Sequence, residues 1–191
     1  MKIDGQEELI EFLMEIDNRV RKVKPKGKIN IFVFGGAAAV LGYGTPRGTM
    51  DLDVHLEYKA IELKLLEWAG PESELEKKYG IYLQSANLTL MAMAPDWTRR
   101  SKEILKNTFQ ILRVLALGKE DLILSKLSRY NDRDRFDIQF IIENCAVEAK
   151  TLIKYYSSAR LYYVGNLQTL DFTFNIILKE HFGKQAMIFK I

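Results

Sequence analysis

The sequence predicts an α/β fold: a short mixed sheet flanked by helices, with a C-terminal helical subdomain. Residues 29–34 form an apolar run with little alternation, which is typical of a strand buried on both faces. Residues 50–56 alternate between apolar and polar side chains, as in a strand with one face in the core. From residue 119 onward, apolar positions recur at helical spacing. We therefore expect a core domain over residues 1–118 and a helical subdomain over 119–191, with no clear linker between them.

Length and composition place the chain in an ordinary class. Its 191 residues are enough for one large domain, or for a domain with a small helical one. Hydrophobic residues make up 48% and charged residues 28%, as in a typical soluble protein. Residues 1–12 lack the apolar stretch of a signal peptide, and no apolar run reaches membrane-spanning length. We expect a cytoplasmic protein without a membrane partner.

The first half of the chain alternates helices with strands. Residues 7–23 have apolar positions at helical spacing, an acidic start and a basic end, so they predict a helix that covers one face of the sheet. A short helix is expected over 37–42. Residues 59–79 read as helical, with a break near Gly70, which precedes a proline.

The second half begins with strands and ends with helices. Further short strands are predicted at residues 81–83, 88–93 and 109–117. Helices are predicted within 120–142, where Asn131 marks a break, and at 148–164 and 167–182. The single cysteine, Cys145, excludes an internal disulfide and a cysteine metal cluster.

Two glycines, Gly35 and Gly36, directly follow the first strand. Without a Cβ atom they let a ligand approach the backbone N–H groups closely. Those N–H groups open the next helix, and a helix N-terminus favours anions. This turn is therefore a candidate phosphate site.

Two carboxylates follow on the second strand, at Asp51 and Asp53. Because alternate side chains of a strand point to opposite faces, Leu52 and Val54 should enter the core while both aspartates share the other face. Neighbouring carboxylates repel unless a cation lies between them, and Mg²⁺ binds one or two carboxylates together with substrate phosphates. The pattern indicates metal-assisted transfer from a nucleoside triphosphate. We expect His55 to point with Leu52 or to cap the end of the strand, and we do not assign it to the metal.

A Gly-Gly turn, a short helix and an Asp-x-Asp strand, in that order, resemble the nucleotidyltransferase superfamily with the DNA-polymerase-β-like fold. The preceding Arg47-Gly48-Thr49 resembles more narrowly the abortive-infection and toxin-type nucleotidyltransferases of bacteria and archaea. The resemblance implies an enzyme that uses Mg²⁺ or Mn²⁺ to move a nucleoside monophosphate from an NTP to a hydroxyl of RNA (tRNA included) or protein. A cognate antitoxin is a further implied partner.

The resemblance also assigns roles to residues. Asp51 and Asp53 would bind the metal and act in catalysis. The turn at 35–36 would hold the β- and γ-phosphates, and Arg47 and Thr49 would support the loop or touch phosphate.

A second pair of motifs lies in the predicted helices. It resembles the lysine-bearing helix and the Arg-Asp-x-x-Asp helix that complete the active site in the toxin-type families, and it comprises Asp121, Lys126, Arg133, Asp134 and Asp137. Lys126 would contact the triphosphate as a point charge. Asp134 or Asp137 would hold a second metal or accept the acceptor's proton. From the residues alone, a surface helix with internal ion pairs is the alternative.

One feature departs from the superfamily pattern. A third carboxylate is common on the third central strand, but in residues 109–117 we place Arg113 at that position. The chain could then be an inactive nucleotidyltransferase-fold partner or antitoxin-binding protein, or a structural scaffold. Two basic patches, over residues 19–28 and around Arg99, fit either a polyanion or a solvated surface.

Overall fold

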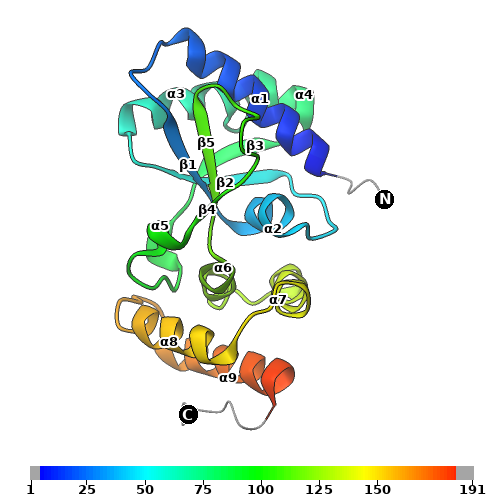
Figure 1. The fold of residues 1–191 in the computed structure, drawn as a ribbon, viewed down its shortest axis with the longest axis vertical. Helices are drawn as coiled ribbons and strands as arrows, with labels where there is room; N and C mark the ends of the chain where they lie inside the picture. The colour runs from blue at the N-terminus through cyan, green and yellow to red at the C-terminus, as the bar shows by residue number, and fades with distance from the viewer. Residues whose placement is uncertain (1–4, 184–191) are drawn as a thin grey trace. The chain divides into compact units, whose positions relative to one another are not determined.

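The computed structural model describes residues 5–183. The chain divides into two compact units, and both are drawn in Figure 1. The sheet unit comprises residues 1–86 and 100–117, and the helical unit comprises 87–99 and 118–191. The predicted α/β class is confirmed.

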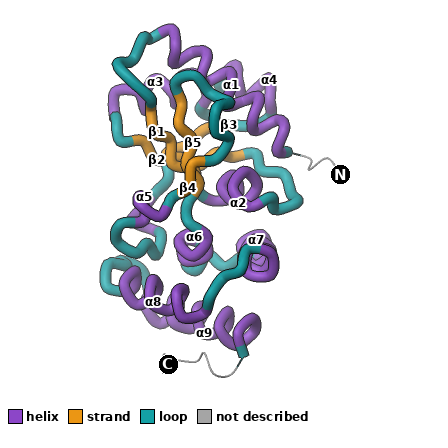
Figure 2. Tube along the Cα trace, in the orientation of Figure 1, coloured by secondary structure: helices purple, strands orange, loops and turns teal. Residues whose placement is uncertain are grey.

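The sheet unit contains one five-stranded mixed sheet in the order β3-β2-β1-β5-β4. Figure 2 shows its strands in orange. They are β1 (Ile29–Val33), β2 (Asp51–Leu56), β3 (Tyr82–Ser85), β4 (Lys102–Glu103) and β5 (Leu112–Ala116). The central strand β1 pairs antiparallel with β2 and parallel with β5, so the sheet is mixed, as predicted.

Helices cover one face of this sheet. They are α1 (Gln6–Lys22), α2 (Gly35–Tyr43), α3 (Lys59–Ala69) and α4 (Glu74–Tyr79), and the predicted break near Gly70 is confirmed. On this face Val33 lies opposite Val54, and both are fully buried. Ser85 donates to Glu62 of α3 at 2.6 Å, which fixes that helix against the edge strand.

Asp17 is the buried acid of α1, and it fastens the helix to β5. Its carboxylate accepts three backbone N–H groups, from Gln110 at 2.9 Å, Ile111 at 2.8 Å and Leu112 at 2.7 Å. The acid is therefore compatible with burial, because its oxygens receive the hydrogen bonds that water would otherwise supply.

The other face of the sheet carries the aspartates. The burial pattern of β2 alternates strictly, with Leu52 and Val54 fully buried and Asp51 and Asp53 partly exposed, so the shared face of the two acids is confirmed. The predicted face of His55 is wrong. His55 lies two residues after Asp53 and therefore shares its face, where its ring packs 6.3 Å from that of Phe32.

The predicted strand at 88–93 is also wrong. The segment forms a single turn of 3₁₀ helix, η1 (Leu88–Leu90), and Leu90 is 64% exposed. The buried positions are instead Ala92 and Ala94, which follow the turn. Apolar composition indicated a strand, but within residues 5–183 no strand pairs with this segment.

The helical unit contains α6 (Lys119–Ser125), α7 (Asp132–Asn144), α8 (Ala149–Arg160) and α9 (Leu167–Phe182), which match the predicted helices. Asn131 caps α7 by accepting the N–H of Asp134 at 3.0 Å, which explains the break there. Tyr156 of α8 stacks on Phe174 of α9 at 3.7 Å. Within residues 5–183, no helix combines the length and the apolar character needed to cross a bilayer.

Candidate active site

The glycine turn forms the first turn of α2. Gly35 has φ +58°, in the left-handed region that favours glycine. The first helical hydrogen bond runs from the Ala38 N–H to the Phe34 carbonyl at 3.0 Å. The N–H groups of residues 35–37 therefore precede the helical pattern and form the positive end of the helix, as the sequence predicted.

Asp53 lies directly against this turn. A Cβ atom at Gly35 would come within 2.5 Å of Asp53 Oδ2, closer than atoms can pack. The Phe34 N–H also donates to the Asp53 carbonyl at 2.9 Å. The phosphate candidate and one metal candidate are thus neighbours, and glycine is favoured here both by its φ and because it leaves room for the Asp53 carboxylate.

Arg47 and Thr49 lie against the second glycine. A Cβ atom at Gly36 would be 2.6 Å from Arg47 Nη2 and 3.0 Å from Thr49 Oγ1. The loop that joins α2 to β2 therefore folds back on the N-terminus of α2. It brings one guanidinium and one hydroxyl to the place where an anion would bind.

Thr49 and Gln84 each donate a hydrogen bond to one of the two aspartates. Thr49 Oγ1 donates to Asp51 Oδ1 at 2.6 Å, and Gln84 Nε2 donates to Asp53 Oδ1 at 2.7 Å. Sequence reasoning missed Gln84. It reaches Asp53 because β3 runs parallel to β2 with Gln84 directly opposite Asp53, and such a register between strands is not visible in either strand alone.

The position assigned to a third carboxylate needs correction. Arg113 pairs with Asn30 near the start of β1, whereas Asp53 bonds to Phe34 just beyond its end. Continuing the β1–β5 register by one residue places Leu117 beside Phe34, and Leu117 is fully buried. Arg113 instead forms an ion pair with Glu103 at 2.8 Å. The nearest β5 position is thus apolar rather than basic.

The donor set at the aspartates fits a divalent cation that is shared with a substrate. Among the described residues, no group of three or more acidic, histidine or cysteine side chains is arranged to hold a metal. Asp51 and Asp53 are two carboxylates beside an N–H turn. That is the arrangement in which Mg²⁺ takes its remaining ligands from water and phosphate.

Lys126, Asp134 and Asp137 meet within the helical unit. Lys126 Nζ lies 2.8 Å from Asp137 Oδ2 and 3.2 Å from Asp134 Oδ1, and none of the three side chains is more than 3% exposed. Arg129 adds a contact to Asp134 Oδ1 at 3.3 Å. Asp134 Oδ2 is buried without a hydrogen-bond partner. Both carboxylates are paired with the lysine.

The other members of the second motif pair take different positions. Asp121 lies in the first turn of α6 and is fully buried, whereas Arg133 is exposed in the first turn of α7. The predicted site residues therefore form two groups. The glycine turn and Asp51–Asp53 belong to the sheet unit, and the lysine cluster belongs to the helical unit.

A family model described as a nucleotidyltransferase of unknown function (DUF6036) matches residues 11–175 of the chain. The searches of curated proteins and of solved structures found no match.

Proposed function

Because the chain belongs to this nucleotidyltransferase family, we propose that it transfers a nucleoside monophosphate from an NTP to a hydroxyl group of RNA or protein, with Mg²⁺ or Mn²⁺. The observation that supports this most is the contact between the Gly35 turn and Asp53, on the face that Asp51 shares. A cytoplasmic location and a cognate antitoxin belong to the same proposal.

The sheet unit would bind the triphosphate. The N–H groups of residues 35–37 and the Arg47 guanidinium would hold the β- and γ-phosphates. Asp51 and Asp53 would hold the divalent cation, which supplies charge neutralisation at the phosphates. The acceptor oxygen forms a bond to the α-phosphorus, the bond from that phosphorus to the bridging oxygen breaks, and pyrophosphate leaves.

The helical unit would supply the remaining groups, as the resemblance implies. Asp134 or Asp137 would accept the proton of the attacking hydroxyl, and Lys126 would contact the triphosphate. In the fold described above, the lysine is paired with both carboxylates. A contact with phosphate therefore requires at least one of these ion pairs to exchange.

The test is an incubation of the protein with each labelled NTP, Mg²⁺ and either bulk tRNA or protein acceptors. We expect label transfer by the wild type and loss of transfer in Asp53→Asn. Glu67→Gln, which neutralises an exposed acid on α3, serves as the control and should retain transfer. Retained turnover in Asp53→Asn, with an unchanged fold by circular dichroism, would refute the site.

An inactive binding protein is the second candidate. The buried Leu117 next to Phe34 favours it, because many active members of the superfamily carry a carboxylate on this strand. Calorimetric titration with Mg²⁺-NTP separates the two. Tight nucleotide binding that depends on Asp51 and Asp53, without label transfer to any acceptor, would support the inactive partner.

A further inference from the structure

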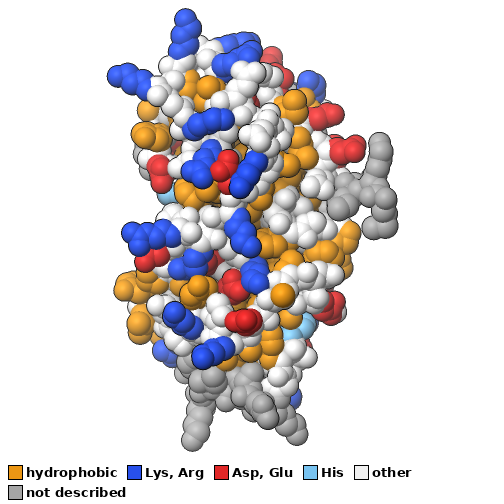
Figure 3. Space-filling view, viewed as in Figure 1, with side chains coloured by type: hydrophobic (Ala, Val, Ile, Leu, Met, Phe, Trp, Pro, Cys, Tyr) orange, Lys and Arg blue, Asp and Glu red, His pale blue; other side chains and the backbone are white. Residues whose placement is uncertain are grey.

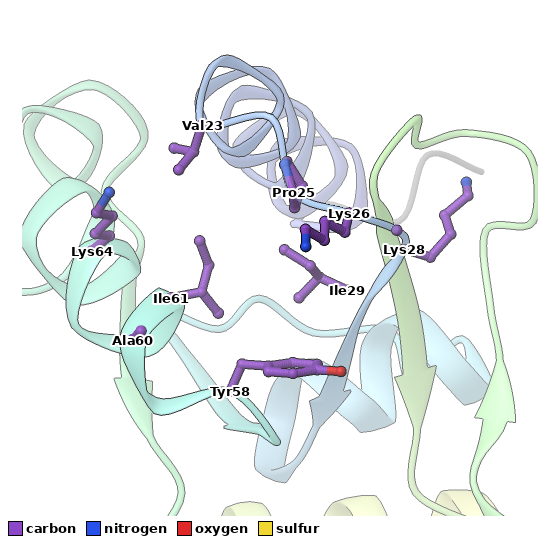
Figure 4. A pocket seen from close by; sticks show the side chains of 10 residues that line it. Val23, Pro25, Lys26, Lys28, Ile29, Tyr58, Ala60, Ile61 and Lys64 are labelled. Carbon is purple, nitrogen blue, oxygen red and sulfur yellow. The ribbon is translucent and has the colours of Figure 1, made fainter.

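A pocket of about 500 Å³ lies in the sheet unit, and Figure 4 shows it. It is bounded by the loop between α1 and β1 and by the start of α3. Its volume is within the range of small-molecule sites in proteins, about 300–1,000 Å³. The side chains that matter for its chemistry are Val23, Pro25, Lys26, Ile29, Tyr58 and Ile61.

The pocket is distinct from the candidate active site. It is lined by Ile29, the first residue of β1, whereas the Gly35 turn follows the last residue of the same strand. The four residue steps from Ile29 to Val33 span about 13 Å at the usual strand rise. A ligand in this pocket would therefore occupy the opposite end of the sheet from Asp53.

The walls of the pocket are mostly apolar. Val23, Pro25, Ile29 and Ile61 supply aliphatic surface, and the Tyr58 ring closes one side (Figure 4). Val23 and Tyr58 remain 38% and 64% exposed, so they would gain burial when a ligand binds. Burying such surface favours an occupant with an apolar body.

The charged lining residues are all lysines. Lys26, Lys28 and Lys64 line the pocket, and none of its described lining residues is an acid. Figure 3 shows basic side chains (blue) at the end of the sheet unit that carries this loop, with hydrophobic side chains (orange) among them. Lys28 already donates to the Phe109 carbonyl at 3.1 Å. In Figure 4, Lys64 and Lys28 extend away from the cavity, whereas Lys26 lies beside Ile29.

We propose that this pocket binds a small hydrophobic carboxylate, with its apolar body against the aliphatic walls and Tyr58, and its carboxylate at the Lys26 amine. One nearby amine matches one negative charge. A polyanion would instead meet apolar walls over most of the surface, and its further charges would be poorly matched because Lys28 and Lys64 extend away from the cavity.

The probe is decanoate, titrated calorimetrically into the full-length chain, with decanol as the neutral analogue of the same length. We expect decanoate to bind once per chain and more tightly than decanol. An exposed lysine–carboxylate pair corresponds to about a two- to fivefold difference in affinity.

Two variants locate the binding. Ala60→Trp places a large ring in the pocket from an exposed position of α3, and should weaken decanoate binding at least tenfold. Leu63→Trp is the control, because Leu63 is on the same helix, outside the lining and 71% exposed, and it should leave decanoate binding unchanged. Lys26→Met keeps the aliphatic stem and removes the charge. It should abolish the preference for decanoate over decanol, whereas Lys77→Met, at an exposed site on α4, should preserve it.

Three outcomes would overturn the proposal: no decanoate binding to the wild type, equal affinity for decanoate and decanol, or full affinity in Ala60→Trp. Thermal unfolding of each variant shows that it is folded before titration. Because no tested residue belongs to the Asp51–Asp53 site, a negative result here leaves the nucleotidyltransferase proposal intact, and loss of transfer in Asp53→Asn leaves decanoate binding intact.

Discussion

The two pairs of candidate site acids, one in each unit, are held in different ways. Asp51 and Asp53 are partly exposed on a strand and receive hydrogen bonds from a threonine and a glutamine, which are neutral. Asp134 and Asp137 are buried on a helix and share the Lys126 ammonium. Both pairs look alike in the sequence, as acids two or three residues apart.

The two pairs differ in how accessible they are to an added ion. The pair on β2 is partly exposed, and its hydrogen bonds from Thr49 and Gln84 bring no charge of their own, whereas the acids on α7 are at most 3% exposed. The lysine between the α7 acids cancels much of their attraction for a further cation, and a buried ion pair is costly to disrupt. We therefore propose the pair on β2 as the metal site, and we expect the pair on α7 to hold α7 to the end of α6.

The largest effect is expected for Lys126→Met. The variant removes the ammonium that two buried carboxylates share, while Arg129 still contacts Asp134 at 3.3 Å, and removal of one partner of a buried pair costs about 3–5 kcal/mol. Denaturant unfolding measures the loss, with Lys150→Met, at an exposed position of α8, as the control. A stability equal to that of the control would show that the cluster does not support the fold.

Gly35→Ala should have the next largest effect. It places a Cβ at φ +58°, 2.5 Å from Asp53 Oδ2, and strain of this kind costs about 1–3 kcal/mol. Gly27→Ala is a matched control, because its Cβ would meet nothing within 4 Å. We expect Gly35→Ala to lower both the unfolding midpoint and the affinity for Mg²⁺-NTP. A variant as stable as the control would mean that the turn is not as tightly packed as described.

Gln84→Glu makes the β2 site more acidic, and so increases the difference in charge between the acid pair on β2 and the lysine-paired acids on α7. It replaces the neutral donor to Asp53 with a third carboxylate, and the lost hydrogen bond should cost about 1 kcal/mol without divalent ions. Mn²⁺ should raise the melting temperature of this variant more than that of the wild type. Gln84→Met, which adds no charge, should show no such gain. An equal response of both variants to Mn²⁺ would argue against a cation at Asp53.

Asp171 provides the smallest test, confined to acid pH. Arg160 donates hydrogen bonds to its two carboxylate oxygens at 2.7 and 2.9 Å, and the Tyr156 hydroxyl donates a third at 2.6 Å. These bonds, mainly those from Arg160, lower the pKa of Asp171 below its usual value of 3.8. A lowered pKa adds stability above pH 3.8, and this contribution is lost as the pH falls through the folded-state pKa.

The measurement is the melting temperature of wild type and Asp171→Asn against pH. The wild type should be more stable at neutral pH, and the difference should shrink only below about pH 4. A difference that stays constant into acid would mean that Asp171 contributes no linked protonation.

The sequence alone was enough for features that depend on neighbours along the chain. Strand alternation gave the common face of Asp51 and Asp53, and helical spacing gave α1 and α9. The same local reasoning failed at His55, which was expected on the face of Leu52 although it lies two residues after Asp53 and so shares the face of the aspartates. It failed again at 88–93, where apolar composition does not reveal whether a partner strand exists.

Only the tertiary structure decided the features that join distant parts of the chain. The register of β3 brings Gln84 to Asp53, and the register of β5 moves Arg113 away from the aspartates. Packing in the helical unit encloses Lys126 between two acids. Local sterics set backbone conformation and side-chain direction, whereas register and burial depend on contacts between residues that are remote in sequence. For this reason the sequence pattern identified both pairs of acids, and only the fold showed that the pair on β2 is partly exposed while the pair on α7 is buried around Lys126.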